Sequence, residues 1–324
     1  MLINEIIKKY WYKIKKILLY PYNMYSSIKL TEEINANIGE DINAVIILMK
    51  GIGDTVYGLS YIKKVIDQAG EVLVIGNKDM RFLVEAYSEK IKFLPYSVSE
   101  NNYSKYQKYF DCERIRSIRT SYCLYNTDPY HVYSHKTRDS ENTAIELLKR
   151  KVFKAEEKCP ITYPPLISYE VESIADFNNI SSHVIIMNPY SNSISSVSVE
   201  VYEQMAKMLL DEGFVVYTND ISGREIVNGT LRLSCTIMEL SVIMQHIAGI
   251  VSIRSGILDL AVNTGTSMFV MYSNCTKKFR EIYSLSAWNG KSKITEVDYD
   301  NISAADFFQL FSNWYNNFDR EPNY

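Results

Sequence analysis

The sequence of 324 residues lacks several features that would place it in a common class at once. It has no long apolar run: a clean stretch such as Ala44 to Met49 is far below the roughly 20 residues that cross a membrane. It also lacks an excess of positive charge, because the net charge is −3, and this disfavours a general nucleic-acid binder. The five cysteines form no CxxC pair, which argues against a zinc site or a disulfide framework and favours a reducing cytoplasm.

What the chain does contain is enough apolar material for a core. Apolar residues make up 47% and charged residues 23%, so the chain is not of the disordered type. Its length suits two domains of about 150 residues each.

The first 20 residues predict a basic amphipathic helix that ends at Pro21. One face is rich in isoleucine, and lysines interrupt the apolar stretch too often for a signal peptide. Residues 1–30 hold six lysines against one glutamate, a net charge of +5. Two interpretations follow: residues 1–20 attach to an anionic membrane surface, or the helix packs its apolar face on its own domain.

The body of the chain predicts two α/β domains with parallel sheets covered on both faces. The first series has apolar strands at 43–49, 72–75 and 91–94, a possible strand at 114–120, and helices at 55–69, 79–88 and 142–153. The second series has strands at 183–187, 214–218, 231–233, 249–253, 268–272 and 294–297, with helices at 199–212, 236–246, 255–264 and 304–318.

A proline-bearing stretch at 159–165 is the predicted linker between the two series. The fold class is therefore two doubly wound Rossmann-like domains facing a central cleft, where ligands of such sheets bind. The predicted boundaries are 1–28 for the basic helix, 29–160 and 161–300 for the two domains, and 301–324 for a C-terminal helix that packs back on the first domain.

The first of three chemically interesting turns is Gly51-Ile52-Gly53-Asp54, which follows the first strand. Two glycines allow a tight turn, and Asp54 at the helix start is either a helix cap or a catalytic, substrate-contacting carboxylate. The turn is not a dinucleotide fingerprint, because position 56 is valine and the second strand ends at Gly76-Asn77 without an acidic residue.

The second turn follows the first strand of the second domain and contains Asn188, Ser191 and Asn192. These side chains can donate to phosphate oxygens, or they form a plain polar loop. The third turn contains Arg254, Ser255 and Gly256, followed by Asp259. A helix start with an adjacent arginine is suited to an anion, and Asp259 orients Arg254 or a ribose, or lies on the helix surface.

Two further motifs favour structural roles. Asp298-Tyr299-Asp300 is a DxD triplet, but its place after the last strand favours a solvated loop. His131 and His135 lack a nearby third ligand, so we predict no metal site.

In their order and spacing, the three turns resemble GT-B glycosyltransferases of the heptosyltransferase type, glycosyltransferase family 9. The resemblance spans about residues 43–275 and rests on Gly53-Asp54, Asn188-Pro189 and the segment Leu260–Ser267, which follows the family pattern lAAalGTp. It implies that Asp54 is the catalytic base, with Gly51 and Gly53 in the acceptor-side turn.

The chain departs from this family in the donor region. Arg254-Ser255-Gly256 replaces Asp-Thr-Gly, and no lysine occurs between Tyr190 and Ser198. The phosphate-binding charge would then lie on Arg254, a placement that also resembles GT-B fucosyltransferases and leaves the donor sugar open. We expect Arg254→Ala to weaken donor binding and leave the fold intact.

The sequence thus predicts a metal-independent glycosyltransferase without a cofactor. A nucleotide-sugar donor would lie with its base near Ser234 and Thr236, and a saccharide or lipid-linked acceptor would lie on the first domain. The expected role is assembly of bacterial surface polysaccharide, capsule or lipopolysaccharide, in the cytoplasm or peripherally at the inner membrane face. The alternatives are a non-hydrolysing nucleotide-sugar epimerase and a non-catalytic sugar-nucleotide-binding module of the same fold.

Overall fold

A computed structural model describes most of the chain as two compact units. The described residues are 42–95, 123–127, 142–168, 183–191, 197–220 and 223–318, with the single positions Tyr25, Glu32, Ile34 and Ala36. The first unit comprises Met1–Lys50 and Lys63–Thr127, and the second comprises Gly51–Ile62 and Asp128–Tyr324. The predicted basic helix, the possible strand at 114–120, His131, His135 and Asn192 lie outside the described residues.

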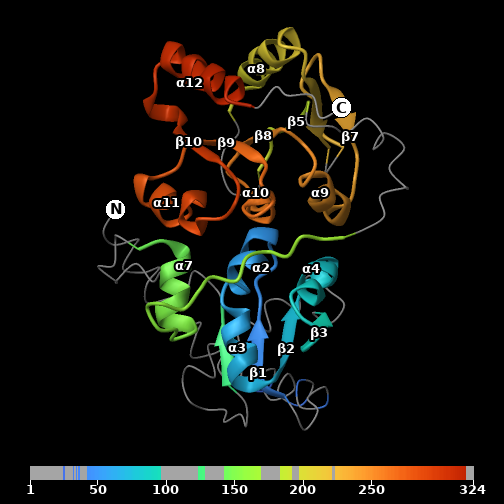
Figure 1. The fold of residues 1–324 in the computed structure, drawn as a ribbon, viewed down its shortest axis with the longest axis vertical. Coiled ribbons are helices and arrows are strands. Elements are labelled where there is room, and N and C mark those ends of the chain that lie inside the picture. Colours follow the sequence, from blue (N-terminus) through green and yellow to red (C-terminus); the bar gives the residue numbers. More distant parts are fainter. Residues whose placement is uncertain are drawn as a thin grey trace, which may run out of the picture. The chain divides into compact units, whose positions relative to one another are not determined.

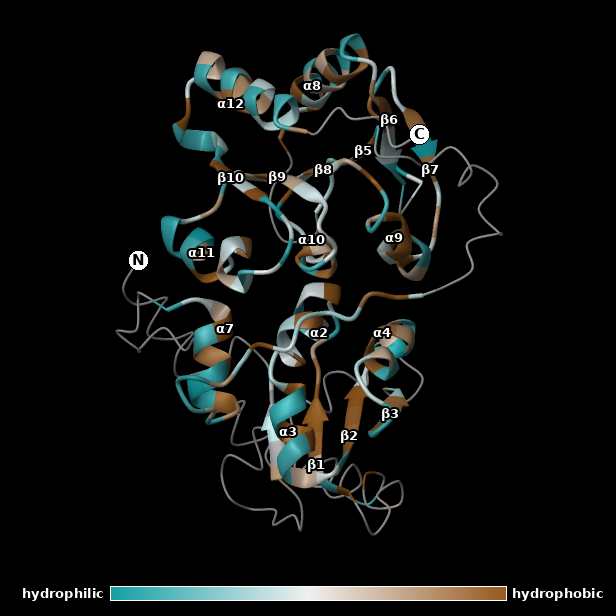
Figure 2. Cartoon of the chain, viewed as in Figure 1, coloured by the Kyte–Doolittle hydropathy of each residue, from teal (hydrophilic) through white to brown (hydrophobic). Residues whose placement is uncertain are grey.

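The first unit contains a parallel four-stranded sheet in the order β3-β2-β1-β4 (Figure 1). Its strands are β1 (Ile42–Ile47), β2 (Glu71–Gly76), β3 (Ile91–Pro95) and β4 (Cys123–Asn126). Strands β1 and β2 are almost wholly apolar and buried, as expected for strands covered on both faces (Figure 2). The three apolar strands of the first series are therefore confirmed, and β4 is an addition to them.

The helix predicted at 55–69 is two helices, α2 (Ile52–Gly58) and α3 (Ile62–Ala69). Helix α2 starts earlier than expected because Gly51, in an extended conformation, is its N-cap. It ends after Gly58, a residue type that weakens a helix interior. A boundary between the units falls just after this break, because Gly51–Ile62 belongs to the second unit and Lys63–Thr127 to the first. In the first unit the chain then forms η1 (Lys78–Met80) and α4 (Arg81–Ala86).

The second unit contains a parallel six-stranded sheet in the order β10-β9-β8-β5-β6-β7. Its strands are β5 (Val184–Asn188), β6 (Val215–Asn219), β7 (Leu231–Leu233), β8 (Gly249–Ile253), β9 (Ser267–Tyr272) and β10 (Ile294–Asp298). Strands 5 to 7 extend to one side and strands 8 to 10 to the other. The strand order therefore reverses between β5 and β8, the position where doubly wound sheets bind ligands at their carboxyl ends.

The other helices and helical turns precede, connect or follow the strands of the second unit. They are α7 (Ala144–Leu147), η2 (Leu148–Val152, a π-helix), α8 (Val199–Asp211), α9 (Ile237–Ile243), α10 (Gly256–Ala261), α11 (Lys277–Ile282), η4 (Leu285–Trp288), η5 (Tyr299–Asn301) and α12 (Ala304–Asn316). The helix predicted at 236–246 begins with a capping box, in which Thr236 and Glu239 exchange both hydrogen bonds. Helix α11 was not predicted from the sequence. No helix among the described residues is long and apolar enough to span a membrane.

The C-terminal helix α12 packs on the sheet of the second unit, so its predicted return to the first domain is wrong. The ring of Phe269 in β9 lies 5.7 Å from Phe307, 5.1 Å from Phe311 and 5.7 Å from Trp314, measured between centroids. The apolar stripe of α12 indicates that the helix is buried on one face, but either sheet could have covered that stripe.

The proline-bearing stretch at 159–165 is not the boundary between the units. It lies within the second unit, where the Thr162 amide donates to the Ser60 carbonyl at 2.6 Å. The Tyr163 hydroxyl donates to the Asn289 carbonyl at 2.9 Å. The predicted division at 160/161 is replaced by one in which α2, α7 and this stretch all belong to the second unit.

Candidate functional site

Asn188 joins three strands at the switch point of the second sheet. It ends β5, is 3% exposed, and its amide nitrogen donates to the hydroxyls of Ser252 at 3.0 Å and Ser255 at 3.1 Å. Its amide oxygen accepts from Asn219 at the end of β6, at 3.1 Å. The structure thus brings two predicted donor-binding residues, Asn188 and Ser255, into direct contact.

Ser255 and Gly256 begin α10 beside the start of α2. Ser255 is the N-cap, and its hydroxyl makes no capping bond within the helix. At Gly256, an added Cβ would lie 2.6 Å from the backbone nitrogen of Gly53, and at Gly53 it would lie 2.6 Å from the Asp259 carboxylate. The two helix starts therefore approach so closely that both positions require glycine.

We expect Gly256→Ala to destabilise the protein by roughly 1–3 kcal/mol, because the backbone of α2 must shift to admit the methyl group. Gly76→Ala is the matched control, since its Cβ would meet only side-chain ends of Leu48 and Phe93, at 3.3 Å. Urea unfolding of both variants measures the difference. Equal stabilities for wild type and Gly256→Ala would show that the helix starts separate freely.

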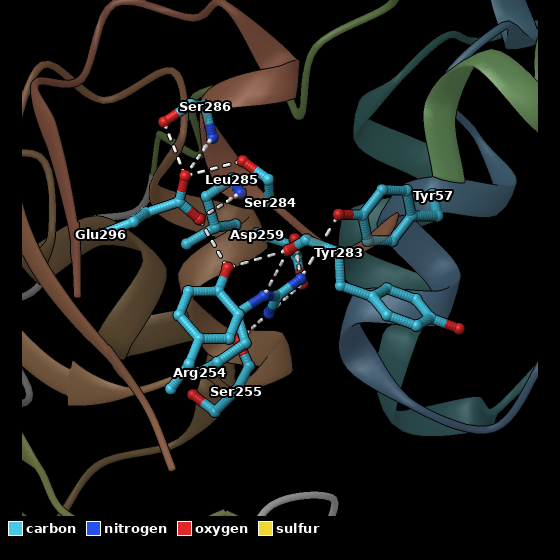
Figure 3. Close-up of polar contacts among 10 residues, drawn as sticks. Tyr57, Arg254, Ser255, Asp259, Tyr283, Ser284, Leu285, Ser286 and Glu296 are labelled. Carbon is cyan, nitrogen blue, oxygen red and sulfur yellow. Dashed lines mark hydrogen bonds and ion pairs between the residues drawn. The ribbon is translucent and has the colours of Figure 1, made fainter. Parts of the chain in front are cut away.

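Arg254 is a buried connector in this structure. It is 5% exposed, and its guanidinium forms a bidentate ion pair with Asp259, with N–O distances of 2.9 and 3.0 Å (Figure 3). The remaining donors reach the carbonyls of Tyr283 at 3.0 Å and Ser255 at 2.6 Å, and the hydroxyl of Tyr57 at 3.3 Å. All five N–H donors of the arginine thus have acceptors inside the protein.

This geometry corrects the expectation that Arg254→Ala leaves the fold intact. Burial alone would lower the pKa of its guanidinium, but the Asp259 carboxylate outweighs burial and holds that pKa above the usual value. Asp259 is itself 0% exposed, so the interpretation of a helix-surface carboxylate is wrong and the one in which it orients Arg254 is confirmed. Direct contact of Arg254 with a diphosphate remains a prediction.

Tyr57 is a site residue that the sequence analysis missed. Its ring lies 5.1 Å from Trp288 and 6.2 Å from Tyr283, and burial raises the pKa of its hydroxyl. The sequence did carry one signal for Tyr57: it follows Gly53 by four residues, so the two residues lie on the same face of a helix. Through Tyr57 the Arg254–Asp259 pair is linked to α2.

A second carboxylate, that of Glu296, holds the segment whose Tyr283 carbonyl accepts a hydrogen bond from Arg254. The Tyr283 carbonyl, an acceptor of Arg254, also lies 3.1 Å from the Tyr272 hydroxyl. Glu296 in β10 accepts hydrogen bonds from the hydroxyls of Tyr272, Ser284 and Ser286 and from the amides of Leu285 and Ser286 (Figure 3). Burial would raise the pKa of Glu296, but these hydrogen bonds outweigh it and lower the pKa. The carboxylate therefore stays ionised and holds the chain at 283–286.

Asp54 is the third residue of α2 and is half-buried. The N-cap is Gly51, so the interpretation of Asp54 as the N-cap is wrong. Its carboxylate lies back over Gly51, where an added Cβ would come within 2.7 Å of Oδ2. Gly51 therefore leaves room for the carboxylate, whose catalytic role stays a prediction.

The other residues predicted to bind the nucleotide-sugar donor differ in their surroundings. The Thr236 hydroxyl caps α9 and also lies 2.8 Å from Glu239. Ser234 is exposed and Ser191 is half-buried.

No cluster of three or more potential metal-ligating side chains occurs among the residues that the structure describes. In the DxD triplet, Asp298 pairs with Arg280 at 2.6 Å and Asp300 accepts from Ser273 at 3.1 Å.

Two units with parallel sheets, the second doubly wound, are the components of the GT-B fold. Solved glycosyltransferases share it. E. coli ADP-heptose lipopolysaccharide heptosyltransferase II matches with a TM-score of 0.56 and 13% identity, covering 85% of this chain and 98% of that chain. A family 9 glycosyltransferase from Veillonella parvula DSM 2008 matches with a TM-score of 0.54 and 12% identity, covering 89% and 93%.

E. coli heptosyltransferase WaaC with ADP matches with a TM-score of 0.53 and 10% identity, covering 83% of this chain and 99% of that chain. The chain therefore shares the GT-B fold of these heptosyltransferases, as predicted. No protein-family model and no curated protein matches the sequence.

Proposed function

We propose that the protein is a glycosyltransferase that moves a sugar from a nucleotide-diphosphate donor to a saccharide or lipid-linked acceptor. The observation that supports this most is the coincidence of the GT-B fold with a polar network, Asn188, Ser252 and Ser255, at the switch point of the second sheet. Amide and hydroxyl groups at that position suit a phosphorylated ligand.

In the proposed reaction the acceptor hydroxyl attacks the anomeric carbon of the donor sugar. Asp54 takes the hydroxyl proton as the new glycosidic bond forms and the bond to the diphosphate breaks. Asn188, Ser191, Asn192, Ser255 and Gly256 form the diphosphate side of the site, with Ser234 and Thr236 near the base.

In this proposal the main role of Arg254 and Asp259 is to hold other parts of the site in position. Their ion pair holds the start of α10 and, through Tyr57, helix α2, which carries Asp54. Protein groups rather than a metal balance the charge of the leaving diphosphate. The proposed setting is bacterial surface polysaccharide or lipooligosaccharide assembly at the cytoplasmic membrane face, where residues 1–20 attach to anionic lipid.

A thermal-shift screen of nucleoside diphosphates and their sugar conjugates tests the proposal. A ligand present at 100 times its Kd stabilises the native state by about 2.7 kcal/mol, so one nucleotide class is expected to raise the Tm clearly. Its sugar conjugate should then release the nucleoside diphosphate when a saccharide acceptor is added. A screen in which none of the adenine, uracil, guanine or cytosine diphosphates raises the Tm would contradict the proposal.

A further inference from the structure

The proposed function calls for a positive charge at the diphosphate, and the guanidinium of the predicted candidate, Arg254, already binds other groups of the protein. Every donor of Arg254 is engaged inside the protein, and its charge is balanced by Asp259. A nucleotide diphosphate carries more than one negative charge, and a fixed guanidinium is the side chain best suited to it. Another cation at the carboxyl end of the second sheet is therefore needed.

Arg224 lies in the segment that follows β6. Its side chain is exposed, and its guanidinium lies over the ring of Tyr190, 5.0 Å from the centroid. No ion pair involves this guanidinium within the part of the chain that the structure describes. The stacking leaves the N–H edge of the guanidinium available while restricting its orientation.

Tyr190 links Arg224 to the switch point. It follows Asn188 by two residues, and the Asn188 amide nitrogen lies 3.5 Å from the Tyr190 carbonyl. The Tyr190 hydroxyl donates to the carbonyl of Glu225 at 2.8 Å, so the tyrosine contacts both Arg224 and its neighbour. The segments after β5 and β6 are thus joined beside the polar network of Asn188.

Asn219 adds a second sign of a ligand at this edge. It ends β6, is 3% exposed, and donates to Asn188 at 3.1 Å. Its own amide oxygen is buried and has no hydrogen-bond partner among the described residues. A buried acceptor without a donor is costly, and the hydroxyls of a nucleotide sugar are donors of the right kind.

We propose that Arg224, held against Tyr190, is the residue that binds the donor diphosphate. This inference rests on the proposed function. The competing cations that follow β9 are Lys277, Lys278 and Arg280. Lys277 pairs with Glu281 at 3.7 Å and Arg280 with Asp298 at 2.6 Å, which leaves the exposed Lys278 as the matched comparison.

The test measures binding by titration calorimetry in the wild type, Arg224→Ala, Arg224→Lys and Lys278→Ala. The probes are ADP, UDP, GDP and CDP, each with its monophosphate. For the diphosphate that binds the wild type, Arg224→Ala should weaken binding about tenfold or more, the scale of a lost charged hydrogen bond. The preference for the diphosphate over the monophosphate should fall as well, and Arg224→Lys should retain part of the affinity.

Tyr190→Leu tests the stacking separately. It removes the ring and should weaken diphosphate binding less than Arg224→Ala does, whereas Tyr190→Phe should keep the stacked guanidinium and most of the affinity. A loss of affinity in Lys278→Ala with unchanged binding by Arg224→Ala would overturn this inference and leave the proposed function standing. Failure of every diphosphate to bind the wild type would overturn both.

Discussion

Asp54→Asn is expected to lower turnover by roughly 10²–10⁴-fold, the usual contribution of a general base. The amide has the size of the carboxylate and keeps an oxygen, but it cannot take the proton of the attacking hydroxyl. Donor affinity should stay the same, because the proposed diphosphate contacts come from other elements. The rate of nucleoside diphosphate release, measured beside donor binding, gives both quantities.

The control for this variant is Asp67→Asn in α3, which removes an equivalent carboxylate from an exposed position. It should leave turnover unchanged. The loss of a first-turn carboxylate in Asp54→Asn also removes a helix-dipole interaction of about 0.3–1 kcal/mol, so a small fall in Tm is expected. If Asp54→Asn retains activity within a few-fold, Asp54 serves α2 and another group is the base.

Arg254→Ala is expected to destabilise the protein by about 3–5 kcal/mol, which is typical when one member of a buried ion pair is removed. The Asp259 side chain is 1% exposed and would lose its bidentate partner, which leaves an unpaired buried charge. The Tyr283 and Ser255 carbonyls would lose a donor at the same time. Urea unfolding measures the change, with the midpoint and the slope compared between variants.

Arg81→Ala is the matched surface control. Arg81 pairs with Glu85 at 2.9 Å, but the two side chains are 51% and 45% exposed, so the expected change is at most about 0.5 kcal/mol. If Arg254→Ala does not fold, Arg254→Lys retains the charge and gives a measurable, smaller loss, because lysine cannot reproduce the planar five-donor contacts. An Arg254→Ala variant as stable as Arg81→Ala would show that the buried pair does not support this unit.

A different result is expected when both charges are removed together. Arg254→Leu with Asp259→Leu leaves no buried charge, so its stability should recover much of the loss seen for Arg254→Ala. Its donor binding and turnover should nevertheless fall, since the link from α10 to Tyr57 is absent. This separation of stability from activity identifies a positioning role that a purely structural pair would not have.

The sequence determined every described strand except β4, and their parallel arrangement. Short apolar runs between polar turns predict buried strands, and the predicted strand at 249–253 has the bounds of β8. Such runs are readable because burial on both faces demands apolar side chains at every position. The capping box of α9 was equally readable, since its two partners are three residues apart.

Only the tertiary structure decided how the helices and the polar side chains are used. Periodicity shows that one face of α12 is buried, but it does not say which sheet covers it. In the same way, the residues around Arg254 place it at the end of a strand, but they do not show whether its side chain points to a ligand or into the protein. Its acceptors include Asp259, five residues away, and Tyr57, 197 residues away. A contact at that separation depends on the path of the whole chain, and it shows that Arg254 is buried and links α10 to α2.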